Sequence, residues 1–500
     1  MNRKRKLILN TISAIANQVV TLVCGLVLPR LIISHYGSTT NGLLSSITHF
    51  LAFFSMMEMG VGAVVRASLY KPLAENDSVA ISKVLVSSRR FFRKIGLLLC
   101  VYTVGLMFYF PLAVNHENGY LSTAILVGAV AFSSLSTYLF GIVYQQLLNA
   151  DQKSYIQLSI QVFTTILNTA FGIILIKLNA SIEMVKLLAA FLFLLRPLLL
   201  KLYVDHNYKL DLKIRLVEEP IKQKWNGLAQ HIATYILKHA DTVVLTLFST
   251  LDNVSIYYVY HLVTNGLQQL IEVLTTGMAA LLGNMYVKKE VEQLNSTFNA
   301  FELSIHSFVT LLYSVAGVMI IPFVKVYTKG ITDADYIVPL FSVLIVTANA
   351  AYCLRMPYYI MIQAAGHFKE TQSSAIIEAI INVLVSVALV KKYGLIGVAI
   401  GTLVAMLYRT VYLALYLRKS ILFRKFSHFV KHFVLDIVTV ILVIISTRWV
   451  SMDEITWISW IKNSIIVGCI SLLECFSINF IFYRKTMRDC LNLLLGRKRS

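Results

Sequence analysis

The sequence carries little charge. Among its 500 residues only 14% are Asp, Glu, Lys or Arg, whereas 57% are hydrophobic, and the mean hydropathy is +0.71. Soluble domains contain about 25% charged residues, so this composition excludes an ordinary soluble enzyme. Proline (8) and glycine (23) are also scarce, which excludes collagenous and disordered low-complexity segments. The chain is therefore predicted to lie largely within a membrane.

Signatures of metal, redox and nucleotide chemistry are missing as well. No CxxC motif and no Cys/His cluster occurs, so the cysteines are predicted to be reduced packing residues and not ligands or disulfide partners. The pattern GxxxxGK[ST] is absent, which argues against an ATPase site in this chain. No cofactor and no metal site is predicted. The cysteines are Cys24, Cys100, Cys353, Cys469, Cys475 and Cys490.

Long apolar runs recur from one end of the chain to the other. A bilayer core about 30 Å thick needs roughly 20 apolar residues per helix. On that criterion the sequence predicts an all-α integral membrane protein with about fourteen transmembrane helices. The predicted spans are 7–34, 41–65, 95–114, 121–148, 155–177, 182–204, 225–249, 254–286, 303–327, 336–362, 371–390, 394–417, 429–449 and 460–483.

The net charge is +20, and the positions of the basic residues along the chain agree with this arrangement of spans. Residues 3–6 (RKRK) precede the first span without a small-residue cleavage site, so we expect a retained, cytoplasmic anchor. If the N-terminus is cytoplasmic, successive loops lie on alternate sides of the membrane. The cytoplasmic loops then contain roughly four times as many Lys and Arg residues as the outer loops. Both termini are then cytoplasmic, and nucleic-acid binding is not needed to explain the charge. The basic clusters on that side are 66–94, 209–224, 418–431 and 484–499.

The segments predicted to lie outside the membrane are short. Residues 78–94 mix apolar and basic side chains and predict an amphipathic helix on the inner surface. On the outer side we expect no segment longer than about a dozen residues, given spans of bilayer length. That leaves no room for an outer catalytic domain, and we expect a protein that is not an enzyme.

A weak internal repeat divides the chain. A shift of 214 residues places Asn168 on Asn382 and Glu58 on Glu272, both in corresponding spans. Parallel repeats of this kind are common in transporters. We therefore predict two pseudo-symmetric six-helix bundles plus two C-terminal helices. The predicted parts are an N-terminal lobe (1–204), a basic cytoplasmic linker (205–224), a C-terminal lobe (225–418), and two extra helices with a basic tail (419–500).

Polar side chains follow one face of several spans. They recur every three or four residues, which is the period of a helix face. The predicted stripes are Asn10, Ser13, Asn17, Thr21 and Cys24 in the first span, Ser45, Thr48, Ser55 and Glu58 in the second, His231, Thr234, Lys238 and Asp241 in the seventh, and His261, Asn265, Gln268, Glu272 and Thr275 in the eighth. Ionisable groups inside a membrane usually face protein or water, so these stripes favour a water-filled cavity between the halves. The alternative is interhelical hydrogen bonding in a dry bundle, with Lys238 neutralising Asp241.

The candidate cavity residues fall into two chemical classes. Cations suit an anionic group such as a phosphate or an acidic sugar, and carboxylates suit proton or cation coupling. Arg355 directly precedes Met356-Pro357, which predicts a broken helix, a feature often found near transport sites. The candidates are Arg30, Glu58, Arg66, His231, Lys238, Asp241, Asn265, Glu272 and Arg355.

Several long stretches resemble a known family. They are LPRLIISHYGSTTNGLLSSITHFLAFFSMMEMGVGAVVRASLYKPLA (28–74), LLNADQKSYIQ (147–157), EPIKQKWNGLAQHIA (219–233), STLDNVSIYYVYHLVTNGLQQ (249–269) and AAGHFKETQSSAIIEAIIN (364–382). These stretches are similar to Wzx-type polysaccharide repeat-unit flippases of the multidrug/oligosaccharidyl-lipid/polysaccharide exporter superfamily. The similarity extends over residues 1–420 and does not identify the sugar.

The resemblance implies a V-shaped pair of six-helix bundles around a central cavity. It implies a flippase that moves undecaprenyl-pyrophosphate-linked oligosaccharide across the bacterial cytoplasmic membrane by alternating access, for capsule, exopolysaccharide or O-antigen synthesis. The implied partners are the lipid-linked oligosaccharide, the bilayer, and a polysaccharide polymerase with its chain-length machinery. The resemblance carries no fixed set of catalytic residues.

Three other functions stay open at this stage. A multidrug or cation antiporter of the same superfamily needs a membrane carboxylate, which Glu58, Asp241 or Glu272 would supply. A lipid II flippase is closer still, and the sequence does not separate it from a repeat-unit flippase. A membrane polysaccharide polymerase is disfavoured because such enzymes generally need a sizeable outer loop.

Overall fold

The computed structural model describes residues 3–113, 119–214, 228–275, 277–484, 486 and 487. Within helices, the side chains of residues 3, 4, 55–60, 63 and 228–234 fall outside this description. The chain divides into two compact units, unit 1 (Met1–Tyr235) and unit 2 (Ile236–Ser500).

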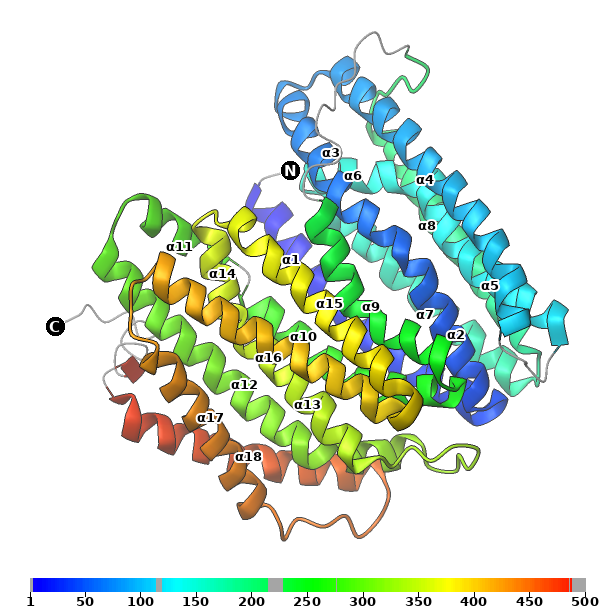
Figure 1. Ribbon diagram of the computed structural model, residues 1–500. Coiled ribbons are helices and arrows are strands. Elements are labelled where there is room, and N and C mark those ends of the chain that lie inside the picture. Colours follow the sequence, from blue (N-terminus) through cyan, green and yellow to red (C-terminus); the bar gives the residue numbers. More distant parts are fainter. Residues whose placement is uncertain (1–2, 114–118, 215–227, 276, 485, 488–500) are drawn as a thin grey trace. The chain divides into compact units, whose positions relative to one another are not determined.

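Every regular element in the described ranges is helical (Figure 1). Unit 1 contains α1 (Arg3–Tyr36), α2 (Ser38–Leu51), α3 (Ser55–Glu75), α4 (Ser78–Ala113), α5 (Gly119–Ser136), α6 (Ile142–Ala150), α7 (Ser154–Lys177) and α8 (Ile182–Asn207). Short 3-10 and π turns, η1 (Ala52–Phe54) and η2 (Thr137–Gly141), join α2 to α3 and α5 to α6. Helix α9 (Leu228–Phe248) runs across the boundary of the units.

Unit 2 continues with nine further helices. They are α10 (Leu251–Thr275), α11 (Met278–Val287), α12 (Val291–Tyr327), α13 (Pro339–Leu354), α14 (Met356–Ala364), α15 (Phe368–Tyr393), α16 (Leu395–Ser420), α17 (Ser427–Ser446) and α18 (Trp457–Phe482). Several helix starts are capped by side chains: Asp77 accepts from the amides of Val79 and Ala80 before α4, and Thr250 accepts from the Asn253 amide before α10. The hydroxyl of Ser181 accepts from the Met184 amide before α8, and that of Thr456 accepts from the Ser459 amide before α18.

The prediction of an all-α multi-pass membrane protein is confirmed. Twelve segments of the described chain are long and apolar enough to cross a membrane. Of the fourteen predicted spans, two are not among these twelve. The span predicted at 41–65 is interrupted by η1 between α2 and α3. The span predicted at 225–249 corresponds to α9, which carries Lys238, His239 and Asp241.

The amphipathic helix predicted at 78–94 is helical in the structure, but it is not a separate element; its position on the inner surface stays a prediction. These residues form the first half of α4, which continues without a break to Ala113. Its apolar side chains are buried in the bundle, since Val84, Leu85 and Phe92 are at most 4% exposed, while Lys83 and Arg93 face outward. The alternation of apolar and basic residues therefore marks a buried face and a solvated face of one long helix.

The second half of α4 exposes an apolar stripe. Leu97, Val101, Val104, Phe108 and Leu112 follow one another every three or four residues, and each is more than half exposed. A contiguous exposed stripe of this length is unfavourable in water, whereas it is the normal outer surface of a helix in lipid. The side chains on this face therefore mark the lipid-facing side of unit 1.

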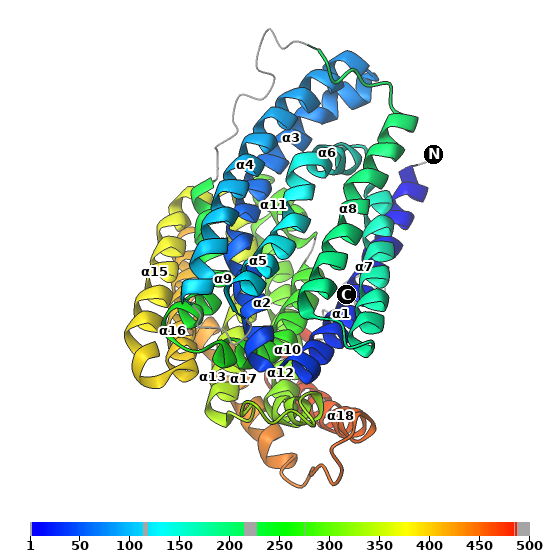
Figure 2. The same cartoon turned by 90° about the vertical axis from the view of Figure 1, so that its right-hand side faces the viewer.

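Helices of unit 1 pack as a bundle in which α1 lies against α7, and α7 against α8 (Figure 2). One end of this bundle is fastened by the turn between α6 and α7. The ammonium group of Lys6 contacts both the carboxylate and the carbonyl oxygen of Asp151, at 2.9 and 2.8 Å. Lys153 and Tyr208 bind the second carboxylate oxygen. The amide of Asn10 brackets the same turn, donating to the Gln152 carbonyl and accepting from the Tyr155 amide.

This junction predicts an acid sensitivity of unit 1. Burial opposes ionisation of Asp151, but hydrogen bonds from Lys153, Tyr208 and Lys6 outweigh burial and hold its pKa below the ordinary value of 3.8. Ionised Asp151 therefore contributes to the free energy of unfolding. This contribution is fully present above pH 3.8, the ordinary pKa, and is lost as the pH falls through the lower pKa of the folded state. Acid unfolding of purified protein, followed by tryptophan fluorescence, should therefore be less steep over this window for Asp151→Asn than for the wild type. Equal slopes would contradict the assignment.

In unit 2, α15 and α16 form a close antiparallel pair (Figure 1). Two glycines on α16 permit the contact. A Cβ atom on Gly397 would lie 2.6 Å from the backbone of Leu389, and one on Gly401 would lie 2.8 Å from the Ser386 amide nitrogen. Real Cβ contacts are longer than this, so the two helices approach at a distance that only glycine allows.

The two C-terminal helices, α17 and α18, both pack on α12 and on each other. A small apolar cluster of Met319, Val443 and Val467 joins the three helices. Ser314 of α12 and Ser471 of α18 share a hydrogen bond of 2.7 Å in the same layer. These extra helices are therefore integral to the packing of unit 2.

Candidate functional site

A buried carboxylate lies where four helices of unit 2 meet. Asp241 of α9 is 3% exposed. Its oxygens accept hydrogen bonds from Tyr257 of α10 (3.0 Å), Asn382 of α15 (3.1 Å) and Thr402 of α16 (2.7 Å). Among the described residues no basic side chain forms an ion pair with Asp241, and Lys238 is exposed. A buried carboxylate without a counter-charge is costly, so this one is expected to bind either a cation or a proton.

The oxygen atoms around Asp241 fit a cation. Asn382 donates from Nδ2, while its Oδ1 atom is buried and has no hydrogen-bond partner. An amide flip would turn that oxygen toward Asp241 and Thr402. The hydroxyl groups of Ser386 and Thr402 both lie against the carbonyl of Val398. Carboxylate, amide, hydroxyl and carbonyl oxygens are the donors that hard cations prefer, and a single carboxylate charge matches a monovalent ion.

Close packing of α15 and α16 positions this group. Gly401 adjoins Thr402, and its Cα faces Ser386 and the carbonyl of Asn382, so the glycine brings donors from both helices together. Asn382, Ser386 and Thr402 are each at most 4% exposed. The geometry is therefore set by backbone contacts and not by flexible side chains.

The stripe predicted on α10 begins beside Asp241. His261 stacks on Tyr257, the residue that donates to Asp241, with ring centroids 5.6 Å apart. Farther along, Gln268 donates to the Glu272 carboxylate at 2.8 Å, and Tyr352 of α13 donates to it at 3.4 Å. Asn265 lies half-buried between these positions. The α10 stripe thus contains two hydrogen-bonded carboxylate environments, one at each end.

Arg355 occupies the predicted break, between the last residue of α13 and the first residue of α14. It is 7% exposed, donates to Glu378 of α15, and stacks over the Tyr352 ring at 4.4 Å. Glu378 also lies 3.8 Å from Arg409 of α16, which donates to the Thr371 carbonyl. Arg355 thus belongs to a buried ion group in which one carboxylate, Glu378, is shared by two guanidinium groups, and it contributes to the packing of unit 2.

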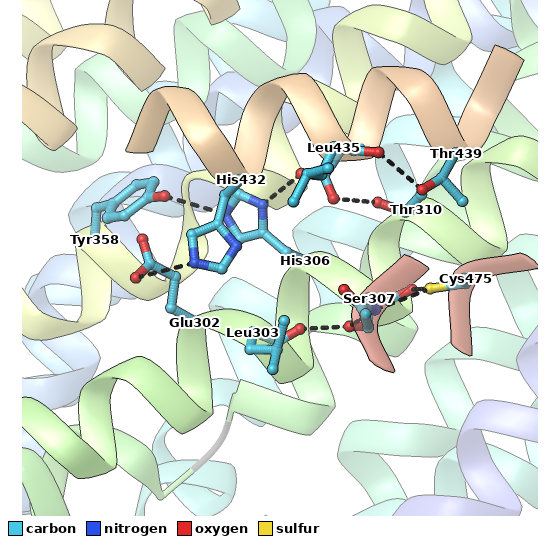
Figure 3. Close-up of polar contacts among 12 residues, drawn as sticks. Glu302, Leu303, His306, Ser307, Thr310, Tyr358, His432, Leu435, Thr439 and Cys475 are labelled. Atoms are coloured by element: carbon cyan, nitrogen blue, oxygen red, sulfur yellow. Dashed lines mark hydrogen bonds and ion pairs between the residues drawn. The ribbon is translucent and has the colours of Figure 1, made fainter. Parts of the chain in front are cut away.

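A second buried ionic cluster lies between α12, α14 and α17 and contains none of the predicted site residues (Figure 3). His306 bonds to Asp436 at 2.6 Å and to the Tyr358 hydroxyl at 3.0 Å. The His432 ring lies 5.0 Å from that of His306 and 3.8 Å from Glu302. These residues stand near the ends of apolar spans, so no stripe singled them out. The sequence signal was the spacing of four residues, Glu302 and His306 on α12 and His432 and Asp436 on α17, each pair one helical turn apart.

The remaining candidates lie in unit 1 or outside the described side chains. Arg66 donates to the Gln146 amide oxygen at 2.7 Å, which joins α3 to α6. Arg30 is half-buried on α1, next to Pro29. The side chains of Glu58 and His231 lie outside the described residues. The water-filled cavity was predicted to lie between the two halves of the chain, and it stays a prediction.

No protein-family model matches the chain, and no curated protein matches its sequence. Solved structures do match. A lipid II flippase MurJ in an inward closed conformation superposes with a TM-score of 0.71 at 15% identity, covering 96% of this chain and 100% of that one. An inward-facing multidrug resistance MATE family transporter of the MOP superfamily gives a TM-score of 0.58 at 15% identity and covers 80% of this chain and 96% of that one. A MATE structure in the bent conformation gives a TM-score of 0.52 at 14% identity and covers 84% of this chain and 95% of that one. The chain therefore has the fold of these transporters and flippases.

Proposed function

We propose that this protein is a flippase that moves a polyprenyl-pyrophosphate-linked oligosaccharide across the cytoplasmic membrane by alternating access. The observation that carries the proposal is the extent of the structural likeness. The match to the lipid II flippase spans 96% of the chain, whereas the matches to the MATE transporters span 80% and 84%. The resemblance of residues 28–74 and 147–157 to repeat-unit flippases supports an oligosaccharide repeat unit as the cargo.

The charges of the predicted cavity support an anionic lipid head. Lys238 is exposed on α9, and the Arg66 guanidinium on α3 makes a bond to a neutral amide, which leaves its charge unmatched by that partner. Each of these cations suits a phosphate group, for which both Arg and Lys are common partners. The amide and hydroxyl groups of the α10 stripe suit a glycan. In this proposal the polyprenyl chain remains in lipid while the head group crosses.

Asp241 and its oxygen neighbours are proposed to couple transport to a monovalent cation, with Na⁺ as the ion favoured by the donor set. A cation bound there would neutralise the carboxylate and draw α9, α15 and α16 together. Binding would thus favour one conformation of unit 2 over another, which is what coupling to an ion gradient requires. A proton on Asp241 would perform the same neutralisation.

Depletion of the protein in its native bacterium tests the cargo. We expect lipid-linked repeat units to accumulate on the inner leaflet, measured by extraction and by access of a membrane-impermeant glycan-modifying reagent to intact cells and inverted vesicles. Accumulation of lipid II with normal repeat units would instead assign the lipid II alternative. Unchanged lipid-linked glycans together with loss of dye efflux would assign the multidrug alternative and overturn the proposal.

A further inference from the structure

A basic pocket lies at the turn between α16 and α17, away from the Asp241 group. Its volume is about 570 Å³, and its lining residues are Leu415, Arg418, Lys419, Phe423, Arg424 and Lys425. Four of these six side chains are cations and none is acidic. Concentrated positive charge beside apolar side chains, at the end of two membrane helices, suits an amphiphile with an anionic head. We propose that this pocket binds the phosphate group of a membrane lipid.

Arg424 provides a fixed guanidinium in the pocket. Its two terminal nitrogens each lie 2.6 Å from one carboxylate oxygen of Glu302 on α12, a bidentate arrangement. The guanidinium also stacks over the Phe298 ring at 4.9 Å. Glu302 is 1% exposed, and the carboxylate that binds Arg424 also lies 3.8 Å from His432 of the buried cluster. The ion pair between Arg424 and Glu302 therefore holds the turn in place. Because Glu302 neutralises Arg424, the other three cations of the pocket remain to bind an anion.

Those three cations are exposed. Arg418 and Lys419 lie in the last turn of α16, and Lys425 lies just before α17. The first turn of α17 contains no acidic residue, and its N-cap residue, Phe426, makes no side-chain cap. The positive end of the α17 helix dipole adds to the potential already created by the side chains.

The apolar part of the pocket indicates a lipid and not a free ion. Phe423 is 80% exposed, and Leu415 is 42% exposed. Phe423 adopts a left-handed backbone conformation with φ 49°, which side-chain-bearing residues rarely take. The fold thus presents an aromatic ring at a position where it packs against little protein. A phosphate held by the cations would place an attached acyl or prenyl chain beside this ring and Leu415.

The site stands apart from the proposed transport function. It can bind a bilayer phospholipid whether or not the protein moves a lipid-linked glycan. The same chemistry is also present in a polyprenyl phosphate, so the test includes both sources. The probes are phosphatidylglycerol, undecaprenyl phosphate and inorganic phosphate, each added to full-length purified protein in neutral detergent, with retained ligand measured by native mass spectrometry.

The test variant is the triple change Arg418→Gln, Lys419→Gln and Lys425→Gln. We expect it to lower retention of the bound lipid by about tenfold or more, because each basic residue near an anionic lipid contributes to binding. The matched control is Lys288→Gln, Lys391→Gln and Lys392→Gln, which removes the same charge from exposed positions elsewhere in unit 2. It should retain lipid as the wild type does. Both triple variants are compared by thermal denaturation, so that a loss of folding is recognised.

A third variant, Phe423→Ser, separates lipid from free phosphate. It should weaken lipid retention and leave inorganic phosphate binding unchanged. Preferential retention of phosphatidylglycerol or of undecaprenyl phosphate supports the proposal and tells which lipid occupies the pocket. Equal lipid retention by the two triple variants overturns the proposal, as does binding of inorganic phosphate without binding of either lipid.

Discussion

Asp241→Asn should abolish ion-coupled transport while leaving the protein folded. The substitution removes the one carboxylate charge among the oxygen donors of α9, α10, α15 and α16, but it keeps a side chain of the same size. Loss of a group that only orients a metal ligand costs 10–100-fold in affinity, so loss of the charged donor itself should lower cation-stimulated transport on the order of 100-fold. The measurement is lipid-linked glycan translocation in proteoliposomes with an imposed ion gradient.

Thermal denaturation provides an independent measure of the same site. A cation that binds only the folded state raises the melting temperature with concentration, so Na⁺ should stabilise the wild type relative to choline. Asp241→Asn should show no such rise, and Asp453→Asn, an exposed carboxylate on the loop before α18, should behave as the wild type. Stabilisation by acid in place of Na⁺ would assign a proton. Full transport by Asp241→Asn would remove this carboxylate from the mechanism.

Glu378→Gln should destabilise the protein strongly. Glu378 is the carboxylate shared by Arg355 and Arg409, and all three side chains are at most 8% exposed. Without it, two buried guanidinium groups face each other with no counter-charge. Breaking a buried ion pair by removing one partner costs about 3–5 kcal/mol, which we expect as the loss in unfolding free energy measured in detergent.

Two control variants make the ion-pair prediction specific. Glu292→Gln removes an exposed acid from the start of α12 and should leave the unfolding free energy within about 0.5 kcal/mol of the wild type. The triple variant Arg355→Met, Glu378→Leu and Arg409→Met replaces the whole ion group by apolar side chains and should recover much of the lost stability. If Glu378→Gln unfolds like the wild type, the three charges do not stabilise unit 2.

The sequence predicted the helices well because each apolar run is a local property. The two runs not among the twelve apolar spans are informative. The segment 41–65 contains a short 3-10 turn that no residue pattern predicted. The segment 225–249 is polar because Asp241 lies within it. The amphipathic segment 78–94 was predicted as a helix, but its continuity with the span that follows was not, because an exposed basic face looks the same on a surface helix as on the end of a spanning helix.

The candidate site was predictable only in part. Asp241 stood out because it belongs to a stripe of polar residues on one face of a predicted span, where a carboxylate is unusual. Its partners Asn382 and Thr402 lie 141 and 161 residues farther along the chain, and a single sequence does not pair such distant positions. Pro357 correctly predicted the break at Arg355, whereas the charge match with Glu378 depends on how α15 packs. Spacing along one helix therefore revealed the carboxylate but not its surroundings.

The turn between α15 and α16 consists of one residue, Gly394, whose φ of 54° and ψ of −126° are accessible to glycine but not to other residues without strain. A connection this short tolerates no change in length. Each inserted residue would rotate α16 by about 100° relative to α15 and carry Thr402 away from Asn382. Insertions should instead be accommodated at the exposed positions 332–333 and 453–454 of the loops 328–338 and 447–456, away from Tyr336, which is buried and bonded to α10. Epitope tags and reporter domains therefore belong in those two loops, where they can report on the protein without disturbing the helices that surround Asp241.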